Sequence, residues 1–273
     1  MYGFIIKKNF CDGWDNLLSL IITNVIFLFC GLGVVCLSAF VTSKFMESLP
    51  ELLFYGIQTL IILLGVIILS IIAFAYGEQA AKIADFRGIN IADFFRAIPG
   101  VIKDAVLFSL MVCAVVFFSF FSIHYYLVEQ QSMLGLCVGA LLIWVDVFFF
   151  LSLQWFIPIR SAMHNNFRKV LKKCFIIFFD NTGFSILMAL NNFIAVIISI
   201  LFIGILPSIA GILINTQNAL RIRLYKYDYL EEHPELKTKK ERRQIPWEDL
   251  IYEDREALGP RKLKSFIFPW KEQ

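Results

Sequence analysis

Long apolar stretches alternate with short polar segments over most of the chain. Four of the apolar stretches are uninterrupted, and they cover about residues 17–41, 52–76, 105–128 and 134–157. Each exceeds the roughly 20 residues that an α-helix needs to cross the hydrocarbon core of a bilayer. The pattern therefore predicts four membrane-spanning helices.

A fifth apolar region, 184–214, is longer and is interrupted by two asparagines, a glycine and Pro207. A straight helix of that length would overshoot the bilayer. We expect one crossing to about Ile205, followed by a shorter arm from Pro207 to Asn218.

The basic residues of the connecting segments predict the orientation. Lys and Arg number four in segment 78–104 and five in 158–183, but one in 42–51 and none in 129–133. Positively charged loops stay on the cytoplasmic side. The N-terminus is therefore expected in the cytoplasm.

The last apolar arm is followed by further basic residues, beginning with Arg221. Placing them in the cytoplasm as well requires an even number of crossings. Six crossings, the last one short or re-entrant, are favoured. Five crossings with the tail outside are the alternative.

Composition supports the bilayer as the solvent of this chain. Hydrophobic residues make up 59% of the 273 positions and charged residues 17%, whereas about a quarter of a soluble domain is charged. The expected fold is all-α: a polytopic membrane helix bundle with five or six crossings and interfacial amphipathic helices. None of the six cysteines forms a C-x-x-C pair, so small buried thiols are expected rather than a disulfide framework.

The C-terminal segment has a different composition. Residues 219–273 hold 13 of the 25 Lys and Arg and 11 of the 22 Asp and Glu. We therefore divide the chain into a transmembrane helical domain, 1–218, and a charged cytoplasmic tail, 219–273. The tail ends in a basic and aromatic cluster formed by Lys262, Lys264, Phe266, Phe268 and Trp270. Such a cluster suits an anionic membrane surface; docking to a partner protein is the alternative.

Two spans are preceded by charged segments with an apolar face. Segment 93–104 places its apolar side chains at helical spacing, opposite charged ones, and contains Pro99. This pattern predicts an interfacial helix that turns into the membrane at Ala105. Segment 165–181 repeats the arrangement, and 7–29 does so more weakly. A duplicated architecture is one interpretation. The other is that any apolar helix preceded by a basic segment shows this pattern, without duplication.

These residues carry a resemblance to the YesL family, bacterial membrane proteins of uncharacterised activity. The family favours a segment such as DFFRAFKQNFKQA at the entry to a span. The matching positions here are Asp93, Phe94, Phe95, Arg96, Ala97, Lys103 and Ala105. The family's polar centre is lost at Pro99, Gly100 and Val101, while the later arm LPSIAGILINTQNALRIRL is similar to the family's closing segment. The resemblance covers about 60–225 and names no catalytic residue. Family members often sit beside carbohydrate-uptake genes, so it implies an accessory role near sugar transport.

Asp146 is a carboxyl group at the centre of the fourth span, in the sequence LLIWVDVFFFL. Such a group is costly there unless it is protonated or paired, and it usually faces the bundle interior. The first interpretation is a neutral carboxyl bonded to a neighbouring helix, for example to Asn24 or Gln58. The alternative is a proton or cation site.

Gly135 and Gly139 form a G-x-x-x-G pattern near the outer end of the same span. Small residues let helix backbones approach each other closely. Packing within the chain is expected, with a homodimer contact as the alternative.

No sequence motif for catalysis is present, and the three histidines lack metal-ligand spacing. We therefore expect no enzyme activity, no cofactor and no nucleic-acid partner. The leading hypothesis is a non-enzymatic accessory or scaffold protein, multi-pass in a bacterial inner membrane, with its N-terminus and tail in the cytoplasm. Its expected partners are the lipid bilayer and a membrane protein, for instance a transporter. The alternative is a small secondary transporter that uses Asp146.

Overall fold

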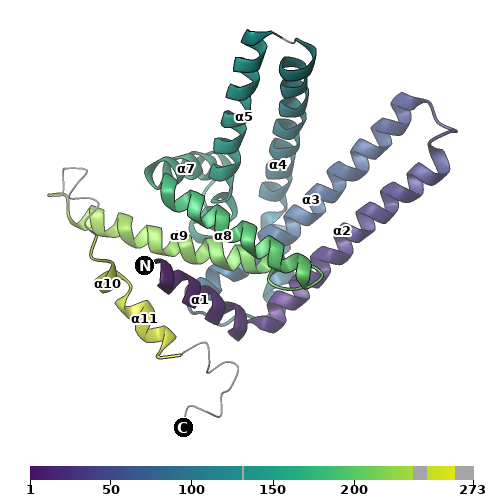
Figure 1. Cartoon of the computed structure of the whole chain (residues 1–273). Helices are drawn as coiled ribbons and strands as arrows, with labels where there is room; N and C mark the ends of the chain where they lie inside the picture. Colours follow the sequence, from purple (N-terminus) through teal and green to yellow (C-terminus); the bar gives the residue numbers. More distant parts are fainter. Residues whose placement is uncertain (131, 236–244, 262–273) are drawn as a thin grey trace.

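A computed structural model describes residues 1–130, 132–235 and 245–261, and every regular element in these ranges is a helix (Figure 1). The all-α expectation is confirmed. Five helical segments of the described residues are long and apolar enough to cross a membrane. They are Leu17–Phe45, Glu51–Ala84, Ile91–Glu129, Met133–Met163 and Thr182–Leu201.

Four of these segments form two helical hairpins. Helices α2 (Leu17–Phe45) and α3 (Glu51–Ala84) form the first, and α4 (Ile91–His124) and α5 (Met133–Leu153) form the second. A short π-helix, η1 (Tyr125–Glu129), extends α4 toward the turn. Figure 1 shows that the two hairpins diverge from a common end, where α1 and α9 lie. We call this common end basal and the end with the two hairpin turns outer.

The core lies at the basal end. The buried residues of α3 run almost without gaps from Ile72 to Ala84, and those of α4 lie between Phe94 and Ser109. Trp155 and Phe156, which connect α5 to α6 (Phe156–Met163), are fully buried there. All six cysteines are free, but the expectation that they are buried is correct only for Cys11 and Cys174, since Cys36 and Cys137 are exposed and the other two are half-buried.

Helix α4 corrects one expectation. It runs unbroken through Pro99 to His124, so the chain does not change direction at Ala105. Proline lacks the amide hydrogen of one helical bond, but the helix is long enough to continue past it. The expected interfacial segment is therefore the first part of a single long helix, and Phe94 and Val101 bury its inner face against the core.

Helix α7 (Phe167–Asp180) buries a single stripe. Its buried residues are Val170, Cys174, Ile177 and Phe178. Basic side chains such as Arg168 and Lys172 are exposed on the other side. This separation follows from the helical spacing of its apolar residues.

The expected sixth crossing is not among the candidate spans of the described residues. Helix α8 (Thr182–Leu201) ends before Pro207, and α9 begins at Ser208 and continues to Glu232. The first half of α9 buries the polar run Asn215–Asn218 together with apolar neighbours such as Ile214 and Leu220. Figure 1 shows α8 lying along α9 rather than beside the four rising helices.

The N-terminal helix and the described residues of the tail lie together at the basal end. Lys7 Nζ of α1 (Tyr2–Asp15) donates to the carbonyl of Gly259, 3.1 Å away, just after α11 (Tyr252–Leu258). On the same side, Arg221 of α9 forms two hydrogen bonds of 3.1 and 3.0 Å with the buried carboxylate of Asp254. Helix α9 passes through residue 218 without interruption, so one helix joins the two parts into which we divided the sequence.

Candidate functional site

Asp146 lies on α5 and accepts a hydrogen bond from the hydroxyl of Ser119 on α4, with an Oγ–Oδ1 distance of 2.8 Å. Its side chain is half-buried. Among the described residues this hydroxyl is its only hydrogen-bond donor. The carboxyl group therefore does bond to a neighbouring helix, but the expected partners, Asn24 and Gln58, were wrong.

Asn24 of α2 instead holds the turn between α8 and α9. Its side-chain amide donates to the carbonyls of Ile205 and Pro207, at 2.8 and 2.9 Å, and its oxygen accepts from the backbone N–H of Ala210 at 3.0 Å. These three bonds satisfy backbone groups that a helix break leaves open. Asn24 is thus a structural residue.

Gln58 of α3 joins the two helices of the first hairpin near its outer end. It accepts from the Ser38 hydroxyl at 2.7 Å and donates to Thr42 Oγ1 at 2.8 Å, both on α2. The three intramembrane polar residues selected from the sequence therefore lie at three separate places.

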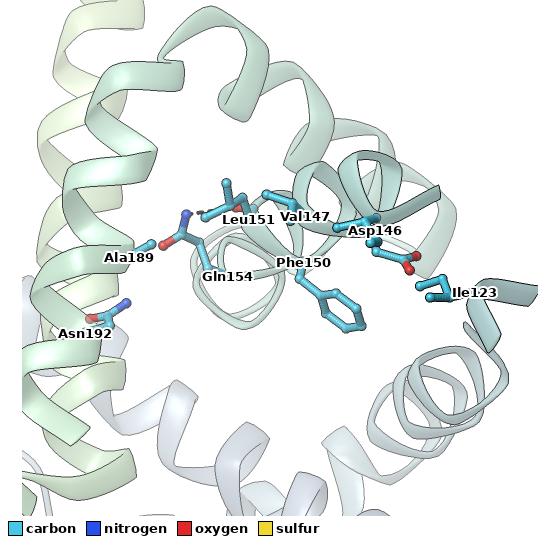
Figure 2. A pocket seen from close by; sticks show the side chains of 9 residues that line it. Ile123, Asp146, Val147, Phe150, Leu151, Gln154, Ala189 and Asn192 are labelled. Atoms are coloured by element: carbon cyan, nitrogen blue, oxygen red, sulfur yellow. Dashed lines mark hydrogen bonds between the residues drawn. The ribbon is translucent and has the colours of Figure 1, made fainter. Parts of the chain in front are cut away.

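Asp146 borders a cavity of about 550 Å³ that lies between α4, α5 and α8 and is widely open to the outside of the chain. The lining residues are Ile123, Ile143, Asp146, Val147, Phe150, Leu151, Gln154, Ala189 and Asn192. Figure 2 shows Asn192 and Ala189 on one side and Asp146 and Ile123 on the other, with Gln154 and the Phe150 ring between them. We call this the lateral cavity. An apolar wall with a few convergent polar groups is typical of small-molecule sites.

Gln154 and Asn192 were not selected together from the sequence. Gln154 Nε2 donates to the carbonyls of Leu151 and Ser185, at 2.8 and 3.0 Å, while its Oε1 is buried without a partner among the described residues. Asn192 Oδ1 accepts from Asn215 Nδ2 on α9. Asn192 had been noted only as an interruption of the apolar pattern.

A chain of hydrogen-bonded polar side chains, most of them buried, leads from the half-buried Asn192 toward the basal surface. Asn215 accepts a hydrogen bond from Asn9, and Asn9 accepts one from Asn218 Nδ2 at 2.8 Å. The same Asn218 nitrogen donates to Asp12 Oδ2 at 2.7 Å. This chain packs α1 against α9. A sequence signal for it existed in the closely spaced polar residues of α9.

The series of hydrogen-bonded side chains that begins at Asn192 ends at an ion pair, in which Lys8 Nζ lies 3.1 Å from Asp12 Oδ2. Lys8 has an exposed fraction of 0%, and its ammonium group lies 3.5 Å from the centre of the Phe86 ring. Burial lowers the pKa of Lys8 and raises that of Asp12, and each charge partly offsets the effect on the other.

Arg160 is the centre of a second ionic cluster. It donates to Glu78 of α3, to Asp104 Oδ2 of α4 at 2.9 Å and to the carbonyl of Gly100 at 2.8 Å. Its side chain is 11% exposed. Arg160 belongs to the basic segment 158–183 whose charge predicts the orientation, but its side chain joins α3, α4 and α6.

Two further cavities, of about 400 and 440 Å³, lie on the basal face and share Glu78, Lys82 and His164. Each Lys and Arg that lines them contacts a carboxylate: Lys82 and Arg96 contact Asp93, Arg87 and Arg221 contact Asp85, and Arg160 contacts Glu78 and Asp104. These cavities therefore offer no surplus positive charge to an anionic ligand. Among the described residues, no cluster of His, Cys, Asp and Glu could hold a metal ion.

Gly135 and Gly139 are both buried against η1. A Cβ added at Gly135 would lie 2.8 Å from the carbonyl oxygen of Tyr126, and one at Gly139 would overlap the Leu127 side chain. The pattern thus serves close packing within the chain. A homodimer contact through these glycines would need a face that η1 already covers.

Replacing Gly135 with alanine is expected to lower the free energy of unfolding by about 1–3 kcal/mol, because a backbone carbonyl cannot yield as a flexible side chain does. The matched control is Gly31→Ala in α2, where nothing lies within 4 Å of the added carbon. That change should be neutral or stabilising by up to about 1 kcal/mol, since alanine is the better helix former. The unfolding midpoint of each variant in detergent measures both effects, and equal midpoints would contradict the packing role.

The basic and aromatic cluster of Lys262, Lys264, Phe266, Phe268 and Trp270 lies outside the described residues.

No protein-family model, curated protein or solved structure matches this chain.

Proposed function

We propose that the protein is a non-enzymatic accessory or scaffold protein of a bacterial inner membrane. The observation that supports this most is the low burial of its spans. Only 6–22% of the residues in the most apolar window of each candidate span are buried within the chain. Large apolar faces therefore remain for lipid and for a partner membrane protein.

Helix α4 illustrates the incomplete packing. None of its residues beyond Ser109 is buried, and Phe117, Phe118, Phe120 and Phe121 are each at least 55% exposed. The aromatic contact between the two hairpins, between Phe74 of α3 and Phe108 of α4, lies nearer to the basal end. A partner helix beside the outer half of α4 would cover these rings.

Photocrosslinking tests the scaffold proposal. The four phenylalanines of α4 are replaced one at a time by a photoreactive phenylalanine, and because a helix turns about 100° per residue they sample several directions. Irradiated cells should yield a discrete adduct with another protein from some positions and not from others. Adducts with lipid alone, or with a second copy of the chain alone, at all four positions would contradict the proposal.

The orientation is part of the same proposal. The contacts of α1 with α11 place the N-terminus and the tail at one end, and the basic loops favour the cytoplasm for that end. Four full crossings by α2–α5, with α8 and α9 forming a re-entrant hairpin, would satisfy both observations.

Cysteine accessibility distinguishes this topology from five full crossings. In a cysteine-free background, an impermeant thiol reagent added to intact cells should label Glu47→Cys at the outer turn. Lys172→Cys in α7 and Tyr252→Cys in α11 should react only after the membrane is made permeable. Labelling of Tyr252→Cys in intact cells, with Lys172→Cys protected, would indicate an odd number of crossings.

We connect this role with carbohydrate uptake through the resemblance to the YesL family. That connection rests on the residues between Asp93 and Ala105 and on the closing arm. If the crosslinked partner is a component of a sugar transporter, the connection with carbohydrate uptake is supported. A partner from an unrelated system would support the scaffold role and contradict the connection with carbohydrate uptake.

The second candidate is a small secondary transporter. The lateral cavity favours it, since the polar residues Asp146, Gln154 and Asn192 line it within segments able to span the membrane. Charge movement on addition of candidate substrates to proteoliposomes tests it, with Asp146→Asn as the matched variant. A current that survives this change would remove Asp146 from the transport reaction.

A further inference from the structure

We propose that the lateral cavity is a binding site for a lipophilic organic cation, specifically a protonated amine carrying an apolar ring system, with Asp146 as its counter-ion. This inference does not depend on the scaffold proposal, because it concerns a small ligand of the isolated chain.

Charge is the first argument. Asp146 receives a single hydrogen bond, from Ser119, and no Lys or Arg contacts it among the described residues. A carboxylate in an apolar cavity has acceptor capacity left for N–H groups of a ligand. A second copy of the chain is a poor source of the missing cation, since residues 105–153 contain no Lys or Arg.

The remaining wall suits the rest of such a ligand. Gln154 lines the same cavity, but its amide nitrogen is used on the carbonyls of Leu151 and Ser185 and its Oε1 is buried, so Asp146 is the acceptor available to the ligand. The Phe150 ring points into the cavity (Figure 2), and aromatic faces attract cations. Ile143, Val147 and Leu151 supply apolar surface for a hydrocarbon ring.

The depth of Asp146 argues against the cationic headgroup of a lipid as its partner, and the arrangement of the polar groups argues against a calcium ion. Asp146 lies about 20 Å along α5 from its outer end and about 10 Å from its basal end, by the helical rise per residue. It is therefore below the level of lipid headgroups. A bare calcium ion would need six to eight oxygen ligands, whereas Asp146 and Asn192 lie on opposite sides of the cavity.

The cavity volume of about 550 Å³ falls in the range of sites for drug-sized molecules. We therefore choose 9-aminoacridine as the probe, a fluorescent amine that is protonated at neutral pH. Acridine, which has the same rings but is uncharged at neutral pH, is the matched neutral ligand.

The test is a fluorescence titration of the purified full chain in neutral-lipid nanodiscs. We expect saturable binding of 9-aminoacridine, and affinity for acridine lower by about tenfold or more. Asp146→Asn, which retains shape and hydrogen bonding, should weaken 9-aminoacridine binding by a similar factor. Glu47→Gln removes an exposed carboxylate from the other hairpin and should leave binding unchanged.

A cavity-filling variant separates loss of charge from loss of fold. Ala189→Phe adds a ring to the α8 wall and should abolish binding while Asp146 remains intact; size-exclusion profiles and unfolding midpoints show that each variant is folded. The proposal is overturned if neither ligand saturates, if acridine binds equally well, or if folded Asp146→Asn or Ala189→Phe binds as the natural chain does. A protein adduct in cells from a photoreactive residue at Ile143, without 9-aminoacridine binding, would assign the cavity to a partner helix instead.

Discussion

Replacing Arg160 with methionine is expected to lower the free energy of unfolding by about 3–5 kcal/mol. The reason is that two carboxylates, Glu78 and Asp104, would remain in a largely buried site with no cation between them. The carbonyl of Gly100 would also lose its donor. Because these groups belong to α3, α4 and α6, the loss would loosen the basal junction of the two hairpins.

Three companion variants sharpen this prediction. Arg160→Lys retains the charge but not the planar group that reaches three acceptors, so it should fall between the natural chain and Arg160→Met. The triple variant Arg160→Met, Glu78→Gln, Asp104→Asn leaves no unpaired charge and should recover most of the lost stability. Arg168→Met on the exposed side of α7 is the control, expected within about 0.5 kcal/mol of the natural chain.

Unfolding can be followed in detergent by the reaction of the buried Cys174 thiol, which is inaccessible in the folded chain. A single-cysteine background removes the signal of the exposed thiols. If Arg160→Met unfolds at the same denaturant concentration as Arg168→Met, the cluster contributes nothing to stability and Arg160 is only a surface charge.

The spans themselves were predictable because they depend on local composition. An uninterrupted apolar stretch of sufficient length determines a crossing helix wherever its neighbours lie, and α2–α5 contain the four expected stretches. The end of the last apolar region was less predictable. Apolar residues continue to Ile214, but the polar run that follows is buried against α1 and makes α9 a packed helix of the basal end.

The site residues show where sequence reasoning ended. Asp146 was recognisable from its position alone, since a carboxyl group is rare in a span. Its partner Ser119 was not, because serine is common in apolar helices and the pairing depends on the register of two antiparallel helices. Arg160, Glu78 and Asp104 are far apart in sequence, and no spacing rule connects them. Lys8 and Asp12 stand four residues apart, a helical pairing distance, and this spacing is a second sequence signal for the buried chain, beside the closely spaced polar residues of α9.

Substituting Lys8 and Asp12 together is expected to leave the chain as stable as before, whereas each single substitution destabilises it. Lys8→Met leaves the Asp12 carboxylate buried with the Asn218 amide as its remaining donor, and Asp12→Asn leaves the ammonium group beside the Phe86 ring. Each should cost about 3 kcal/mol. The double variant removes both buried charges and should return to within about 1 kcal/mol of the natural chain.

The pH dependence follows from the direction of the two shifts. The pKa of Lys8 is lower in the folded chain than its usual value of 10.5, so between the folded value and 10.5 the unfolded chain binds more protons and stability rises with pH. The pKa of Asp12 is raised above 3.8, so from 3.8 up to its folded value the folded chain binds more protons and stability falls as pH rises.

A double-mutant cycle across pH measures these contributions together. The natural chain should gain stability relative to the Lys8→Met, Asp12→Asn variant as the pH rises toward 10.5, and this gain should be absent from any chain that lacks Lys8. The coupling free energy at neutral pH should be several kcal/mol, because either charge alone is worse than none. A harmless Lys8→Met would show that the ammonium group reaches water in solution, and the buried chain from Asn192 to Lys8 would then end at Asp12.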